Sequence, residues 1–407
     1  MAQKERTMKT KTSLIIVLGI VYILQPLSAQ TWESTKRLTW NSGSSLGPDI
    51  KIDTNDTIHF VWSDDTPGNS EIYHKKSKDG GTTWFPFKRI TWNSGNSAGR
   101  IAIDSNNHIH LVWSDNSKDS DIYEIYYKKS TDGGATWIGT KRLTWTAYDS
   151  GSPVIAVDSA NNIHIVWVEK YTRPALPPLY ASYWELYYKR STNGGNSWIN
   201  TKRLTWFYQN CQSPDITIDT DDTIHLVWAH RPVTNDTTIY DIYYKRSTSS
   251  GVTWTSTKRL TWTSEVSRSP SVASFSNSTI HLVWEIAMPG NDEIHYKRSV
   301  DGGATWSGGK QLTWNTSFSK NSCIAADSSN RVYIVWRDNI TGDSEIYFKK
   351  STDGGISWIS TKRLTWNSGT SLGPDIGLDS LNNVHILWSD DTPSQFNYEI
   401  YYKKGTQ

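Results

Sequence analysis

The chain has 407 residues and a formal net charge of +2; 36% of its residues are hydrophobic, 20% are charged and 22 are tryptophans. A near-neutral chain argues against nucleic acid as a partner, because binding to a phosphate backbone needs clustered lysine and arginine, whereas the Lys-Arg pairs here are spread along the whole sequence. The two cysteines, Cys211 and Cys323, cannot build a zinc site. We therefore predict neither a metal site nor a cofactor.

The first 29 residues have the layout of a secretory signal peptide. Four basic residues precede an apolar run from Leu14 to Leu24, and the small residue Ala29 ends the segment. The run is too short for a comfortable membrane span. We predict cleavage after Ala29, a secreted or cell-surface location and no membrane span in the mature chain, with an uncleaved anchor as the alternative. Removal of these residues changes the net charge to −1.

Three short motifs then occur seven times each. The first is KRLTW at 36–40, the second IHFVW at 58–62 and the third EIYHKK at 71–76, and successive copies are 52 to 61 residues apart. Each motif is rich in branched and aromatic residues and is bounded by Asn, Gly, Ser, Asp or Pro, which is typical of short β-strands. One period therefore contains four strands, at 48–53, 58–63, 71–76 and a last one ending at 90–92.

A period of four short antiparallel strands indicates a propeller blade. We predict an all-β, seven-bladed β-propeller with blades at 48–92, 99–145, 153–206, 214–262, 270–314, 322–366 and 374–404. The last repeat stops after its third strand, and residues 31–40 have the sequence of the missing fourth strand. The N-terminal strand should complete the seventh blade and close the ring, which removes an open sheet edge. The predicted organisation is a signal peptide at 1–29 and one propeller domain at 30–407.

An octapeptide between the third and fourth strands carries a family resemblance. Ser77-Lys78-Asp79-Gly80-Gly81-Thr82-Thr83-Trp84 returns at 130–137, 191–198, 247–254, 299–306 and 351–358. It resembles the Asp box, Ser-x-Asp-x-Gly-x-Thr-Trp, of the bacterial neuraminidase repeat, which implies a sialidase-like propeller. In that family the boxes are structural and lie away from the active face. We expect the Asp carboxylate to accept hydrogen bonds from turn amides and glycine to supply positive φ; Ser249 is a weaker substitute in the fourth copy.

The tryptophans follow the same repeat. Seven end the second strands, seven end the fourth strands and seven lie at or after the octapeptide position, which accounts for 21 of the 22. We expect all 21 indoles to be buried and to hold the fold without disulfides. The two cysteines fall in non-neighbouring repeats and should be free thiols. Six histidines on the second strands occupy one repeat position, so we interpret them as structural rather than as metal ligands.

The loops that follow the second and fourth strands share one face, here called the top face. The family resemblance implies that a ligand binds there, around the axis where the inner strands begin. A sialidase uses three arginines to clamp the sugar carboxylate, a Tyr-Glu nucleophile pair and an aspartic acid as acid/base. Arg100 lies in the nearest match to the Phe-Arg-Ile-Pro motif of that family, although Phe and Pro are missing. The catalytic candidates are Arg100, Arg268, Arg337, Asp49 and Asp115.

The third blade has a long loop after its second strand, which contains the one tryptophan outside the repeat. Aromatic side chains beside hydrogen-bonding groups suit the stacking of sugar rings. The candidate ligand-binding residues are Trp184, Tyr183 and Arg173 in this loop and Arg231 in the fourth blade; the alternative is an insertion packed on its own surface.

Three functions fit this sequence. The preferred one is a monomeric, secreted binding module for an extracellular glycan or glycoprotein, since near-identical blades suit repeated weak sites used together. The alternatives are a sialidase-like exo-glycosidase and a structural scaffold of the cell envelope. Known sialidases that this chain resembles have six blades rather than seven, so the resemblance leaves catalysis open.

Overall fold

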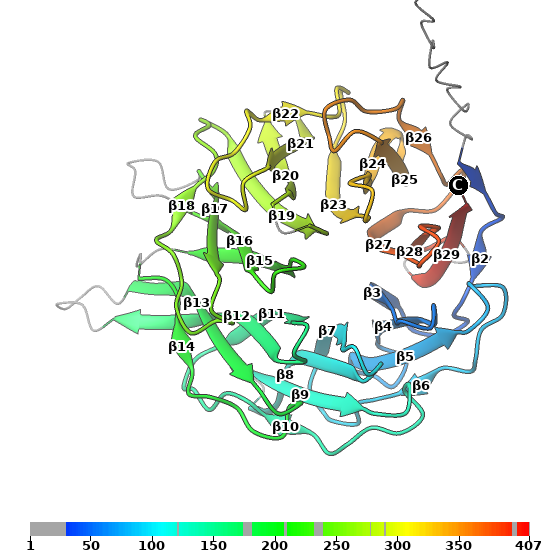
Figure 1. The fold of residues 1–407 in the computed structure, drawn as a ribbon. Helices are drawn as coiled ribbons and strands as arrows, with labels where there is room; N and C mark the ends of the chain where they lie inside the picture. Colours follow the sequence, from blue (N-terminus) through cyan, green and yellow to red (C-terminus); the bar gives the residue numbers. More distant parts are fainter. Residues whose placement is uncertain are drawn as a thin grey trace, which may run out of the picture.

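A computed structural model describes residues 30–119, 122–173, 181–206, 210–231, 239–276, 278–288, 290–392 and 397–406, without the side chains of 118–119, 172–173 and 181–182. The predicted signal peptide lies outside these ranges. Within them, the chain forms seven antiparallel sheets that follow one another around a central axis (Figure 1). No helix in the described ranges is long and apolar enough to cross a membrane. The predicted all-β, seven-bladed propeller is confirmed.

Each blade has four strand positions in chain order, starting at the axis (Figure 1). Blade 1 consists of β3 (Ser45–Ile52), β4 (Ile58–Asp64), β5 (Glu71–Ser77) and β6 (Lys88–Arg89). Blade 2 consists of β7 (Ser97–Ile103), β8 (Ile109–Asp119), β9 (Ile122–Ser130) and β10 (Lys141–Arg142). Blade 3 consists of β11 (Ser150–Val157), β12 (Ile163–Arg173), β13 (Ala181–Ser191) and β14 (Lys202–Arg203).

The other four blades repeat this order. Blade 4 consists of β15 (Cys211–Ile218), β16 (Ile224–His230), β17 (Asp241–Ser247) and β18 (Lys258–Arg259). Blade 5 consists of β19 (Val266–Ser274), β20 (Ile280–Met288), β21 (Asn291–Ser299) and β22 (Lys310–Gln311). Blade 6 consists of β23 (Ser319–Ala326), β24 (Val332–Thr341), β25 (Asp343–Ser351) and β26 (Lys362–Arg363). Blade 7 contains β27 (Ser371–Leu378), β28 (Val384–Asp390) and β29 (Glu399–Thr406), and β1 (Thr31–Trp32) and β2 (Lys36–Arg37) complete it.

The N-terminal segment closes the ring as predicted. Both β1 and β2 pair antiparallel with β29, so that Thr31 lies opposite Thr406 and Lys36 opposite Tyr402. The pairing continues to Leu38, whose amide donates to the Ile400 carbonyl at 2.7 Å. Leu38 is buried at the junction of blades 7 and 1. The fourth strand position of blade 7 is therefore filled from the other end of the chain.

Neighbouring blades are joined by two contacts that occur at every junction. The octapeptide-position tryptophan of one blade meets an aromatic side chain on the third strand of the preceding blade, as Trp84 meets Tyr402 edge-on with ring centroids 5.1 Å apart. A lysine of the third strand also reaches back, as Lys75 Nζ donates to the Leu38 carbonyl at 2.7 Å. The equivalent lysines are Lys128, Lys189, Lys245, Lys297, Lys349 and Lys403.

The octapeptides form the turns between the third and fourth strands, and the predicted role of their aspartate is confirmed. Asp79 accepts hydrogen bonds from the Thr83 amide at 2.8 Å and from the Thr83 hydroxyl at 2.5 Å. Ser249 replaces aspartate in the fourth copy and still accepts from the Thr253 amide at 2.8 Å. Gly81 has a φ of +85°, and a Cβ atom there would lie 2.0 Å from the hydroxyl oxygen of Tyr402. Glycine is thus required both by the turn and by the blade junction.

The prediction that 21 tryptophans are buried is wrong for one set of seven. The tryptophans of the second strands are at most 2% exposed, and those at the octapeptide position are partly buried. The seven that follow the fourth strands are instead 59–70% exposed. The reason is that strand pairing ends at Leu38, so the alternation that would bury Trp40 on the same face as Leu38 no longer applies.

The predicted structural role of the repeated histidines is confirmed. In blade 2, His110 Nδ1 lies 2.8 Å from the Tyr127 hydroxyl and His110 Nε2 lies 3.2 Å from Asp104 Oδ2, within the buried interior. Cys211 and Cys323 are free thiols in blades 4 and 6. In the part of the chain that the structure describes, no group of three or more His, Cys, Asp or Glu side chains is placed to hold a metal ion.

The inner strands break the sevenfold repeat at their top ends. In six blades the register shifts by one residue there, as between Leu46 and Asp49 in β3. Each of these β-bulges contains a residue with φ between 47° and 61°, namely Gly47, Ser152, Ser213, Ser269, Asn321 and Gly373. In β7 the register is continuous from Ser97 opposite Asp115 to Ile103 opposite Ile109. Blade 2 is therefore the one blade whose inner strand reaches its top end without a bulge.

Candidate functional site

Three aspartates at the axial ends of the inner strands connect neighbouring blades. Each carboxylate accepts a hydrogen bond from a backbone amide of the next inner strand: Asp49 from Ile101 at 2.6 Å, Asp215 from Val272 at 2.8 Å and Asp375 from Ile50 at 2.8 Å. Asp49 also accepts from Lys51 Nζ at 3.2 Å. The catalytic candidate Asp49 is therefore buried and bonded within the scaffold.

Arg100 lies at the same level of the axis and is exposed to solvent there. It makes no hydrogen bond or ion pair within the described residues. Partial desolvation by the surrounding protein lowers the pKa of Arg100, but the negative charges of Asp49, Asp375 and Asp215 outweigh this effect and raise the pKa. Burial raises the pKa of Asp215 to about 6. The axial mouth is thus a mixed-charge cluster with one guanidinium group available to a ligand.

Asp115 belongs to a repeated polar network at the top end of the second strands. It is 2% exposed and accepts hydrogen bonds from the Ser97 hydroxyl at 2.6 Å and from the Ser117 amide at 2.8 Å. Asp64, Asp338 and Asp390 make the same contacts in their blades. These hydrogen bonds fix the loop that follows the second strand. Asp115 therefore has the same environment as Asp64, Asp338 and Asp390, and nothing in it indicates a catalytic role.

The other two candidate arginines lie together in blades 5 and 6. Arg268 donates to Glu285 Oε2 at 3.2 Å and to Asp292 Oδ2 at 2.6 Å, and Lys320 Nζ lies 2.8 Å from the same Asp292 oxygen. Arg337 interacts electrostatically with this group, and burial lowers its pKa. Arg268 and Arg337 therefore share one set of carboxylates, whereas Arg100 faces the axial set.

The long loop of blade 3 is an extended hairpin of β12 and β13. Tyr183 lies opposite Tyr171, and Trp184 lies opposite Lys170. Trp184 is partly buried and packs against the hydrophobic cluster between blades 3 and 4. Arg231 is partly buried and its amide donates to the Asn210 carbonyl at 3.2 Å. The Arg173 side chain lies outside the described residues, so the structure relates Tyr183 and Trp184 to one hairpin but does not join all four candidates in one site.

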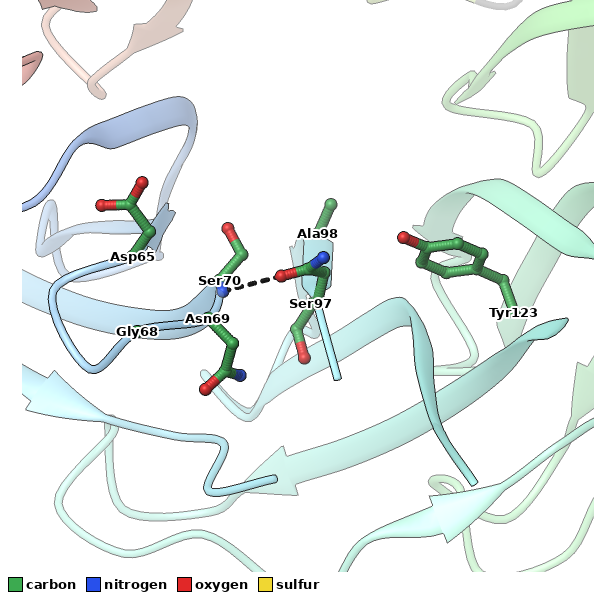
Figure 2. Close-up of a pocket in the computed structure, with 8 residues that line it drawn as sticks. Asp65, Gly68, Asn69, Ser70, Ser97, Ala98 and Tyr123 are labelled. Atoms are coloured by element: carbon green, nitrogen blue, oxygen red, sulfur yellow. Dashed lines mark hydrogen bonds between the residues drawn. The ribbon is translucent and has the colours of Figure 1, made fainter. Parts of the chain in front are cut away.

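A cavity of about 380 Å³ opens on the top face between blades 1 and 2. Figure 2 shows Tyr123 on one side of this top-face pocket, Asp65 on the other, and Ser70 and Ala98 between them. The remaining lining residues are Gly68, Asn69, Asn96 and Ser97. Its size falls within the range of ordinary small-ligand sites.

The top-face pocket carries polar groups with bonding capacity left. The Asn96 side-chain oxygen accepts from the Ser70 amide at 3.0 Å (Figure 2). The Ser70 hydroxyl, the Asn96 Nδ2 group and the Tyr123 hydroxyl have no hydrogen-bond partner among the described residues, and Asp65 is exposed. A carboxylate acceptor, an amide donor, two hydroxyls and one aromatic ring form a site that suits a small polyhydroxylated ligand.

The top-face pocket lies beside β7, the one inner strand without a bulge. We attribute the open space to the bulge residue that β7 lacks at its top end, next to Ala98. The sequence carries this signal, because Arg100 is eight positions after Trp92, whereas Asp49 is nine positions after Trp40. Sequence reasoning missed the pocket, since it weighed charged and aromatic residues rather than this one-residue deletion.

Comparisons with known proteins give the fold and no family. No family model and no curated protein matches the chain. Among solved structures, a protein of unknown function from Dyadobacter fermentans aligns over 93% of this chain and 100% of its own with 15% identity and a TM-score of 0.56. Polysaccharide lyase Uly1 aligns over 90% of this chain and 91% of its own, with 10% identity and a TM-score of 0.59. Hadza microbial sialidase Hz136 aligns over 86% of this chain and 76% of its own, with 14% identity and a TM-score of 0.51.

Proposed function

We propose that this chain is a secreted glycan-binding propeller whose top-face pocket takes one sugar residue. The observation that carries the proposal is the coincidence of the top-face pocket with the one inner strand that has no bulge. Asp65, Ser70 and Asn96 supply the acceptors and donors that sugar hydroxyls need, and Tyr123 supplies an aromatic ring. Propellers of similar fold that are named as a sialidase and as a polysaccharide lyase support carbohydrate as the ligand class.

Binding is favoured over hydrolysis because the candidate acids are already engaged. Asp49 holds the Ile101 amide, and Asp115 is buried within a network that other blades repeat. Arg268 is paired with two carboxylates, and Arg100 faces a different set. A sialidase-like glycosidase needs a free carboxyl group as its acid/base and three arginines that converge on one sugar carboxylate.

Filling the top-face pocket tests the proposal. Ala98 is exposed and lines it, so Ala98→Trp occupies its volume without removing a hydrogen bond. Leu372→Trp is the matched control, because Leu372 holds the equivalent register position in blade 7. Saturation-transfer NMR of the mature chain with a panel of monosaccharides should show binding by the wild type and by Leu372→Trp, and none by Ala98→Trp. Equal binding by all three proteins, or binding of no sugar by the wild type, contradicts the proposal.

One observation favours the sialidase-like alternative, namely the unpaired guanidinium of Arg100 at the axis. A carboxylate-bearing sugar could pair with it. Release of the aglycone from a fluorogenic sialoside, lost in Arg100→Ala, would establish this activity in place of simple binding. We expect no release by either protein.

A further inference from the structure

The rim of the propeller carries seven exposed tryptophans in equivalent positions. These rim tryptophans follow the fourth strands and are 59–70% exposed: Trp40, Trp92, Trp145, Trp206, Trp262, Trp314 and Trp366. They contribute little to the core, in which the tryptophans of the second strands and of the octapeptides are packed. A large exposed apolar side chain is informative when it recurs, because single exposed residues need no explanation and repeated ones do.

Each rim tryptophan lies against at least one cation of the blade junction. The Arg37 guanidinium carbon lies 5.6 Å from the Trp40 ring centroid, and Lys75 Nζ of the next blade lies 5.9 Å from it. Both cations are fixed, since Lys75 donates to the Leu38 carbonyl at 2.7 Å and Arg37 donates to Glu399 at 2.7 Å. The indole is therefore held against the protein while most of its surface faces solvent. A ligand that stacks on it does not have to order a mobile side chain.

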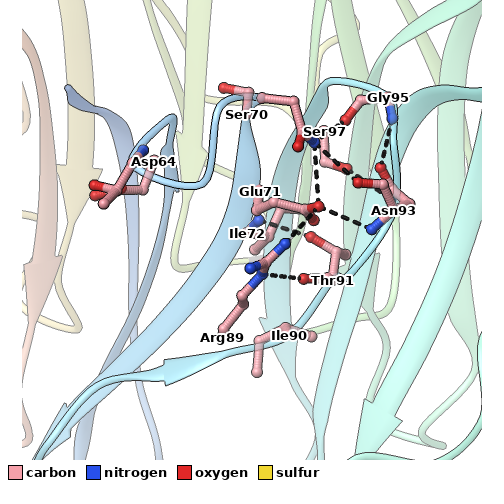
Figure 3. A network of polar contacts seen from close by, with 12 residues as sticks. Asp64, Ser70, Glu71, Ile72, Arg89, Ile90, Thr91, Asn93, Gly95 and Ser97 are labelled. Atoms are coloured by element: carbon pink, nitrogen blue, oxygen red, sulfur yellow. Dashed lines mark hydrogen bonds and ion pairs between the residues drawn. The ribbon is translucent and has the colours of Figure 1, made fainter. Parts of the chain in front are cut away.

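Figure 3 shows the equivalent network of blade 1, which underlies Trp92. Glu71 accepts from Arg89 Nη2 at 2.9 Å and from the Asn93 amide at 2.8 Å, and Arg89 Nε donates to the Thr91 carbonyl at 2.8 Å. Glu71 is fully buried, whereas the Arg89 side chain keeps 25% of its surface exposed. The acid thus fixes the arginine from inside the blade and leaves its outer edge to solvent.

Six of the seven rim junctions carry net positive charge. Each contains the lysine from the next blade, an arginine from its own blade and one buried acid, except that Gln311 replaces arginine beside Trp314. In five of the junctions the third arginine nitrogen, Nη1, makes no hydrogen bond within the described residues; these arginines are Arg37, Arg89, Arg142, Arg259 and Arg363. An anionic group beside the ring would find a charge and a free donor there.

We infer that the rim tryptophans form a multivalent binding surface for an anionic polysaccharide. Each indole stacks on the C–H face of one sugar ring, and the neighbouring arginine binds a sulfate or carboxylate of the chain. Seven weak and equivalent sites on one body gain affinity from effective concentration rather than from any single contact. None of these residues lines the top-face pocket, so this inference goes beyond the proposed function and stands or falls separately from it.

A polysaccharide fits the rim better than a lipid surface does. The rim tryptophans lie one per blade junction and are separated around the ring, so they do not merge into one apolar face. Membrane insertion depends on contiguous apolar area, whereas stacking of sugar rings needs isolated flat platforms. The ring of sites also matches a ligand that is itself a repeating chain.

The experiment compares dextran sulfate with neutral dextran, which share a backbone and differ in charge. Binding of the mature chain to immobilised polymer is measured for the wild type, for single Trp→Ala variants at Trp92 and Trp314, and for the variant with all seven rim tryptophans replaced. We expect the wild type to prefer dextran sulfate and Trp92→Ala to weaken binding by about threefold to tenfold. The variant with all seven rim tryptophans replaced should weaken binding by more than about 100-fold. Trp314→Ala should have the smallest effect, because Gln311 leaves that junction without arginine.

Three further variants separate charge from stacking and from unfolding. Arg89→Gln copies the natural Gln311 and should weaken binding to dextran sulfate, while Gln311→Arg should strengthen it. Ile356→Ala removes another exposed apolar side chain, 62% exposed in the octapeptide turn, and should change nothing. Three results would each overturn the inference. The first is undiminished binding by the folded variant that lacks all seven rim tryptophans, and the second is equal binding to both polymers. The third is rim-dependent binding to vesicles of phosphatidylserine and phosphatidylcholine with none to dextran sulfate.

Discussion

Leu38→Ala tests whether the N-terminal segment is a structural part of the ring. Leu38 is 3% exposed and packs between blades 7 and 1, against residues such as Ile400 and Ile50. Deleting its methyl groups removes apolar burial and leaves a cavity, which for a buried leucine costs about 2–5 kcal/mol. We expect a loss of ~3 kcal/mol in the free energy of unfolding.

Calorimetry translates this loss into a temperature shift. Unfolding entropy per residue gives a domain of this length an entropy of ~0.8 kcal/mol per kelvin, so a loss of ~3 kcal/mol lowers Tm by ~4 °C. Leu143→Ala is the matched control, because Leu143 holds the same repeat position in blade 2 and is 2% exposed. Its fourth strand follows its third directly along the chain, so no closure is involved.

The two variants should lower Tm by the same amount. If Leu38→Ala leaves Tm unchanged while Leu143→Ala lowers it, the N-terminal strand is not seated in blade 7 in solution, and the closure described here is refuted. If neither variant has an effect, the burial argument itself fails at this position.

Two other predictions concern the scaffold. Gly81→Ala should destabilise the protein by about 1–3 kcal/mol, because its Cβ would meet the Tyr402 hydroxyl. Gly47 also has a positive φ but has open space around it, so Gly47→Ala should destabilise the protein less. Urea denaturation of the two variants tests this difference. Burial lowers the pKa of His281 to about 4, while an unfolded histidine titrates near ~6.5. Only the unfolded chain then takes up this proton between those values, so stability should fall by ~2 kcal/mol between pH 7 and pH 5 through this residue. His281→Gln should show a smaller fall; an unchanged pH dependence would mean that His281 is accessible to protons in the folded state.

The repeat made the architecture predictable from the sequence. Seven copies of each motif define seven blades, and the position of residues 31–40 relative to the repeat defines the closing strand. Local turn chemistry was equally accessible, because the donors to the Asp79 carboxylate, on Ser77 and Thr83, lie within the same short hairpin.

The exposure of the rim tryptophans was not predictable in the same way. Leu38 and Trp40 are two residues apart, so strand alternation places both on the buried face. Their different exposure depends on where pairing with β29 stops, and directly beyond that point the Asn41 amide donates to the Glu399 side chain instead of to a backbone carbonyl. Other blades form the same contact between residues 22 positions apart, as between Asn93 and Glu71, so the end point depends on a side-chain contact that strand alternation does not include.

The top-face pocket illustrates a second limit. Its lining comes from Asp65 and Ser70 in blade 1 and from Asn96 and Tyr123 in blade 2, none of which stands out in the sequence. Small polar residues are common in loops, and only the neighbouring blade and the missing bulge turn these ones into a site.

The most direct test of the proposed function is to locate a bound sugar. A crystal structure of residues 30–407, soaked with the monosaccharide that binds best, should show that sugar in the top-face pocket, bonded to Ser70 and Asn96 and in contact with Tyr123. A sugar found at the axis beside Arg100, with the top-face pocket empty, would contradict this account and favour the sialidase-like alternative.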